Sequence, residues 1–72
     1  MIDVNLAEEL FGKKILLIDN EDKEWIGILD CITSDADNEE DDTPGEYSVT
    51  LEVGKRYYEF FDHEVKSIQA AE

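Results

Sequence analysis

The longest β-favouring run in the chain, residues 23–34, constrains the fold most, because every other apolar segment is short enough to lie beside it in a sheet. Its apolar side chains fall on both faces, with Leu29 on one side and Ile26 and Ile28 on the other. This pattern is typical of a long strand that is covered on both faces. Gly27 lies inside the run, and a glycine within a strand marks a bend, a bulge or a close backbone approach. We therefore expect residues 23–34 to form the central strand and to turn a corner at Gly27.

A short helix is predicted before this run. Leu6 and Leu10 lie one helical turn apart, and Gly12 follows them as a natural end to a helix. Asp3 or Asn5 can cap its start. So short a helix is marginal in water by itself, so it must pack against the sheet. We expect a helix over about residues 3–11 that docks by an apolar stripe, namely Ile2, Leu6, Leu10 and Phe11.

The remaining apolar segments are predicted to be short strands. Residues 46–53 alternate cleanly, which is typical of a half-buried strand whose odd-numbered positions face inward. Val65 and Ile68 can both reach the core only if a tight turn precedes the last strand. Cys31, within the central strand, is expected to be a buried and inert thiol. The four strands beside the central one are expected at about residues 13–19, 46–53, 56–61 and 65–69.

Helix and strands together predict a mainly β protein with one domain over residues 1–72. A chain of this length holds a single compact core. Five short antiparallel strands, one of them long and bent, have one economical arrangement, a small and strongly bent barrel whose open end is closed by the helix.

The chain is strongly acidic, with 20 acidic residues against 6 basic ones and a net charge of −14. Such a surface repels nucleic acid and anionic membrane and attracts basic partners. One cysteine cannot build a disulfide framework, which suits the cytoplasm. No secretory leader pattern and no apolar run of the roughly 20 residues needed to span a bilayer is present, so we expect no membrane association.

Many of the acids lie in one predicted loop, residues 35–45, which contains no large apolar residue. Its acids match part of the spacing of an EF-hand calcium loop, but Glu40 stands where the sharp turn needs glycine. We favour a solvated loop, with weak binding of divalent cations as an alternative and no resident metal or cofactor. The side chains of this loop that we take as candidate contacts are Asp35, Asp37, Asn38, Glu39, Glu40, Asp41 and Asp42.

Several short motifs, taken in order, resemble the Sm-like (LSm) β-barrel family, a kind of SH3-like barrel. They are GKKI at 12–15, WIGIL at 25–29, YEF at 58–60 and EVKSI at 64–68. With TS at 33–34 and DNE at 37–39, the chain is most similar to short, acidic, uncharacterised Sm-like proteins of Gram-positive bacteria and their phages. The resemblance implies a helix followed by five antiparallel strands, rings formed by pairing of the fourth and fifth strands, and RNA bound at the ring centre. The chain has Asp62-His63-Glu64 where the family carries a basic residue and glycine, which argues against RNA.

His63 lies between two acids at the end of the fourth predicted strand. A neighbouring carboxylate favours the charged imidazole, so His63 is a candidate pH-sensitive contact. No serine or cysteine nucleophile lies near it in the sequence, so we expect no catalysis.

Two aromatic residues are predicted to face outward on the fourth strand, Tyr57 and Phe61. Exposed aromatics on an edge strand indicate an interface with a partner or with a second copy of the chain. Our first hypothesis is therefore a non-catalytic acidic module that binds a protein through these aromatics and the acids of the loop, and the charge favours a basic partner. The alternatives are a homo-oligomeric RNA-binding ring and a module that binds divalent cations through the loop.

Overall fold

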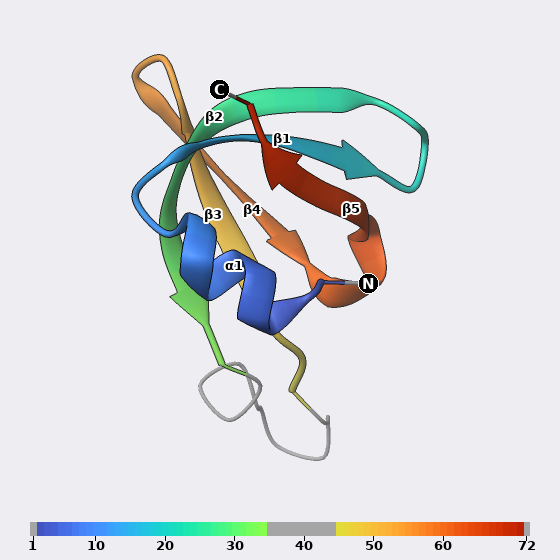
Figure 1. Ribbon diagram of the computed structural model, residues 1–72. Coiled ribbons are helices and arrows are strands. Elements are labelled where there is room, and N and C mark those ends of the chain that lie inside the picture. Colours follow the sequence, from blue (N-terminus) through green and yellow to red (C-terminus); the bar gives the residue numbers. More distant parts are fainter. Residues whose placement is uncertain (1, 35–44, 72) are drawn as a thin grey trace.

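The computed structural model describes residues 2–34 and 45–71. It contains one short helix and five strands, as predicted, and each element begins and ends within two residues of its expected position (Figure 1). The elements in chain order are α1 (Val4–Leu10), β1 (Lys14–Asp19), β2 (Glu24–Thr33), β3 (Ser48–Val53), β4 (Arg56–Phe61), a single 3₁₀ turn η1 (Asp62–Glu64) and β5 (Val65–Ala70).

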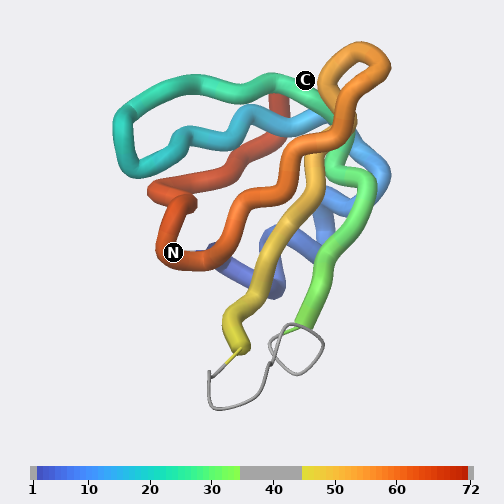
Figure 2. Tube along the Cα trace, turned by 180° about the vertical axis from the view of Figure 1, so that it is seen from behind, coloured from blue at the N-terminus to red at the C-terminus, as the bar shows by residue number. Residues whose placement is uncertain are grey.

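The five strands form one antiparallel sheet in the order β4-β3-β2-β1-β5, so β2 is central, as predicted. The first half of β2 pairs with β1 and its second half with β3, and Ile28 takes part in both pairings. The strand curves strongly along its length (Figures 1 and 2). The sheet of the described residues is open, since the outer strands β4 and β5 are joined through η1 but not paired with each other. The antiparallel sheet is thus confirmed, whereas the described strands do not close into a barrel.

Gly27 lies one residue before the position where β2 passes from one partner strand to the other. A Cβ atom at this position would lie 2.5 Å from the Glu52 carbonyl oxygen and 2.9 Å from Val53 Cγ2. The glycine is therefore required by the close approach of β3. The change of register in β2 lies further along, between Leu29 and Cys31.

The core lies between α1 and the concave side of the sheet, with α1 packed against β2 and β5. Every helix and strand contributes to it, and its buried apolar residues are Ile2, Ala7, Leu10, Ile15, Leu17, Leu29, Val49, Leu51, Phe60, Val65 and Ile68.

The stripe predicted for α1 is wrong at Phe11, whose side chain is 56% exposed. The helix ends at Leu10, and the backbone of Phe11 is no longer helical, so its side chain leaves the face that carries Leu10. Ala7 is fully buried in its place. The capping prediction is confirmed, because Asp3 accepts a hydrogen bond from Leu6 N at 3.2 Å, and Gly12 has the positive φ of +79° that suits a helix end.

Two expectations for the central strand are wrong. Ile26 and Ile28 are exposed, because α1 covers only the concave side of the sheet. Cys31 is exposed rather than buried. Strict alternation places it on the inner face with Leu29, but the extra residue Asp30 shifts the register and turns Cys31 outward.

A second register shift explains how the last strand buries two residues that lie three positions apart. Asp19 pairs with Val65 and Ile18 with Ser67, so Lys66 is the extra residue of a bulge. Val65 and Ile68 both reach the core, as predicted, and the tight turn that precedes them is η1.

Candidate functional site

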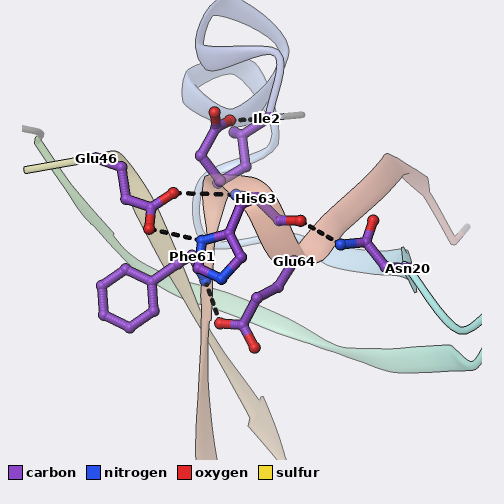
Figure 3. Close-up of polar contacts among 7 residues, drawn as sticks. Ile2, Asn20, Glu46, Phe61, His63 and Glu64 are labelled. Atoms are coloured by element: carbon purple, nitrogen blue, oxygen red, sulfur yellow. Dashed lines mark hydrogen bonds and ion pairs between the residues drawn. The ribbon is translucent and has the colours of Figure 1, made fainter.

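The turn between β1 and β2 lies beside η1 at one end of the molecule, as both views of the chain show (Figures 1 and 2). Asn20 joins the two segments, because its backbone N–H donates to the Glu64 carbonyl at 3.1 Å and its side-chain amide donates to the His63 carbonyl (Figure 3). Lys66 forms an ion pair with Asp22 across the same junction. At the other side of η1, Asp62 accepts a hydrogen bond from Ile2 N at 2.6 Å. These contacts fix the position of η1 relative to the sheet.

A cleft of about 490 Å³ opens where these segments meet. Acidic side chains and aromatic rings share its lining, which consists of Asp19, Asn20, Glu21, Trp25, Phe60, His63 and Glu64. Its volume falls within the range of small-ligand sites, about 300–1,000 Å³. The cleft is the candidate binding site.

Asp19 organises one wall of the cleft. Its Oδ1 accepts hydrogen bonds from the backbone N–H groups of Glu21 at 2.9 Å and Lys23 at 3.0 Å. Its Oδ2 accepts one from Trp25 Nε1 at 3.0 Å. The indole hydrogen bond, followed by the two backbone N–H groups and the nearby Lys23 charge, lowers the pKa of Asp19 below 3.8. Asp19 therefore holds both the turn and the orientation of the indole.

Aromatic rings form the apolar part of the lining and its support. The Trp25 ring lies 5.1 Å from the Tyr58 ring and 5.2 Å from the Phe60 ring, the second pair in an edge-to-face arrangement. Lys23 Nζ lies 4.4 Å from the centre of the Trp25 ring, within cation–π distance. The indole thus already contacts one cation of this chain.

His63 contacts a carboxylate, but not one of its neighbours in sequence. Its Nδ1 lies 2.7 Å from Glu46 Oε1, and its backbone N–H donates to Glu46 Oε2 at 3.1 Å (Figure 3). Glu64 instead accepts a hydrogen bond from Phe61 N at 3.1 Å. The imidazole also stacks on the Phe61 ring, with 6.4 Å between ring centres and 15° between planes.

The predicted aromatic contacts lie outside the cleft lining. Tyr57 is 63% exposed on β4, as predicted. Phe61 lies on the same face of β4 by strand alternation, but it is half-buried because His63 stacks on it. Phe61 is therefore a weaker surface contact than expected. The seven acidic-loop candidates, Asp35, Asp37, Asn38, Glu39, Glu40, Asp41 and Asp42, lie outside the described residues.

The sequence pattern does not predict the cleft. Asp19 ends the first predicted strand, Glu21 lies just beyond it, and Trp25 lies within the predicted central strand. One signal was available, since an aspartate that opens a polar turn often binds the backbone N–H groups that follow it. The other wall comes from η1, and Asn20 and His63 are 43 positions apart. Their meeting depends on the pairing of β1 with β5, which the sequence pattern does not specify.

Within residues 2–34 and 45–71, no three His, Cys, Asp or Glu side chains are close enough together to hold a metal ion. The one helix of this part of the chain is too short to cross a membrane. Comparison with models of known protein families, with curated proteins and with solved structures finds no match to the chain.

Proposed function

We propose that this protein is a non-catalytic acidic module that binds a basic segment of another protein. The observation that carries the proposal is the cleft, which is lined both by acidic residues, Asp19, Glu21 and Glu64, and by the aromatic residues Trp25 and Phe60. Carboxylates beside aromatic rings attract cationic side chains both by charge and by cation–π contact. The net charge of −14 extends this attraction beyond the cleft and speeds encounter with a basic partner.

A second surface supports a protein partner. Ile26, Ile28 and Tyr57 are exposed on the convex face of the sheet, and Ile28 and Tyr57 both pair with Glu52 from opposite sides. Apolar and aromatic residues that flank a carboxylate are suited to the core and rim of a protein interface. In this proposal the convex face and the acids of residues 35–42 extend the contact made by the cleft.

We further propose that the fold is Sm-like, with its five described strands in an open, strongly bent sheet. The proposal is supported by the order of elements, a helix followed by five antiparallel strands, and by the sheet order with β4 and β5 outermost. The curvature of β2, which pairs first with β1 and then with β3, supports it as well.

The single cysteine is consistent with the cytoplasm, where we place the module.

Binding of labelled peptides tests the proposed function. The protein is titrated with a lysine- and arginine-rich peptide, with an acidic peptide of equal length as the matched control, and with single-stranded RNA. We expect binding of the basic peptide alone, with an affinity that falls as salt rises. Failure to bind the basic peptide even at low salt would contradict the proposal.

One observation favours a second candidate, a homo-oligomeric ring that binds RNA. The outer strands β4 and β5 leave two sheet edges that copies of the chain could pair. Light scattering tests this candidate, because a ring gives a particle several times the mass of the chain, whereas the acidic module needs no oligomer. RNA retained by such a particle would favour the ring over our first proposal.

The third candidate, divalent-cation binding by residues 35–45, is tested by thermal unfolding. Specific binding of calcium raises the melting temperature above that in a monovalent salt of equal ionic strength. Equal melting temperatures would exclude it.

A further inference from the structure

We infer that the cleft between the β1–β2 turn and η1 receives one arginine side chain of the basic partner. The inference rests on the proposed function and specifies the residue type that the site accepts. It follows from three features of the cleft: the carboxylate oxygens that remain available, the aromatic rings beside them, and the size of the space.

The three carboxylates of the cleft differ in the number of hydrogen bonds that they already accept. Asp19 accepts three hydrogen bonds from its own turn and from Trp25. Glu64 accepts one from Phe61 N through Oε1. Among the described residues, none forms a hydrogen bond or ion pair with the Glu21 carboxylate. Glu21, with the second oxygen of Glu64, therefore supplies the acceptors for an incoming donor.

The aromatic rings favour a planar cation. Trp25 lies in the cleft lining beside Phe60, and its indole is held in a fixed orientation by the bond to Asp19. A guanidinium group stacks on aromatic faces, is weakly hydrated, and donates to two carboxylate oxygens at once. An ammonium group is compact and strongly hydrated, so it loses more when it leaves water for a cleft of this kind.

Lys23 Nζ lies 4.4 Å from the centre of the Trp25 ring, a distance at which an aromatic ring attracts positive charge. Lys23 does not line the cleft, so it leaves the space itself open to a second cation. The volume of about 490 Å³ accommodates an arginine side chain together with water. A phosphate or nucleotide would meet repulsion from three carboxylates, so nucleic acid does not suit this cleft.

Two peptides test the inference, one with arginines spaced by glycines and one with lysines in the same places. Length and charge are equal, so a difference in affinity reports the side chain. The emission of Trp25, the only tryptophan, reports binding at the cleft, and calorimetry gives the affinity. We expect the arginine peptide to bind several-fold more tightly and to change the indole emission.

Two variants with the same change of charge locate the site. Glu21→Gln removes the free carboxylate of the cleft, whereas Glu9→Gln removes one from the exposed face of α1, outside the cleft. Loss of a hydrogen bond to a charged group predicts about a tenfold weaker binding of the arginine peptide to Glu21→Gln. Glu9→Gln is expected to bind nearly as the parent does, and thermal unfolding verifies that both variants are folded.

The outcomes separate this inference from the proposed function. Equal binding of the two peptides, with equal effects of Glu21→Gln and Glu9→Gln, would overturn the arginine site while leaving the basic partner in place. No binding of either peptide at low salt would overturn both. Tight binding of the arginine peptide that is weakened selectively by Glu21→Gln is the result that the geometry predicts.

Discussion

The substitution Gly27→Ala tests the packing on which the bent sheet depends. The added methyl group would lie 2.5 Å from the Glu52 carbonyl oxygen, a distance that Cβ atoms essentially never show. The obstacle is backbone, held by the pairing of β2 with β3, so it cannot rotate away as a side chain would. The strands must therefore separate by about half an ångström or more to restore ordinary contact.

Overpacking of this kind costs about 1–3 kcal/mol, and replacing a strand glycine by alanine returns about 0.5–1 kcal/mol of backbone entropy. Because backbone must move, we expect the upper part of the range to apply and a net loss of about 2 kcal/mol. For a domain of this size, that loss lowers the melting temperature by roughly 8–16 °C. Circular dichroism during thermal and urea unfolding measures both quantities.

Gly54→Asn is the matched control, because it also adds a side chain to a glycine of the β3 region. No atom lies within 4 Å of a Cβ built at Gly54, and its φ of +65° is a conformation that asparagine tolerates. We expect the control to change the free energy of unfolding by less than about 0.5 kcal/mol. A Gly27→Ala protein as stable as the control would refute the close approach of β2 and β3.

Three further predictions concern stability. Asp19→Asn should lower the melting temperature at neutral pH. The pKa of Asp19 in the folded protein lies below its ordinary value of 3.8, so the ionised carboxylate stabilises the fold above pH 3.8. This stabilisation is lost as the pH falls through the lowered pKa. The difference from the parent should therefore shrink in acid, and a constant difference in melts from neutral pH downward would argue against the Asp19–Trp25 contact. Tyr57→Ala should change the free energy of unfolding by less than about 0.5 kcal/mol, because the Tyr57 side chain is exposed. Leu51→Ala should lower it by about 2–5 kcal/mol, because Leu51 is fully buried. Urea unfolding measures both changes. Added sodium chloride should raise the melting temperature up to physiological ionic strength, because it screens the repulsion within a chain of charge −14; a steady fall would mean that the acids are mostly paired.

The sequence pattern predicted the elements well where a single periodicity governs a segment. The alternation of residues 46–53 corresponds to β3, with Val49 and Leu51 fully buried, and the long apolar run corresponds to the central strand β2. These features depend on which residues are apolar and how they are spaced, and both are local properties of the chain.

The errors arose where one residue interrupts a periodicity or where distant segments meet. Asp30 adds one residue to β2 and turns Cys31 outward, and no local signal distinguishes it from an ordinary strand residue. Ile26 and Ile28 are exposed because α1 packs on the concave side of the sheet and no second helix of the described residues covers the convex side. The cleft itself depends on the register between β1 and β5, which brings Asn20 to η1.

An NMR titration of the isotope-labelled protein with the arginine peptide tests the binding cleft most directly, since it reports each backbone amide separately. We predict that the largest shift changes fall in residues 19–25 and 60–64, with a change at the Trp25 indole N–H. Shift changes confined to the convex face around Ile26, Ile28 and Tyr57, with the cleft unchanged, would contradict the account.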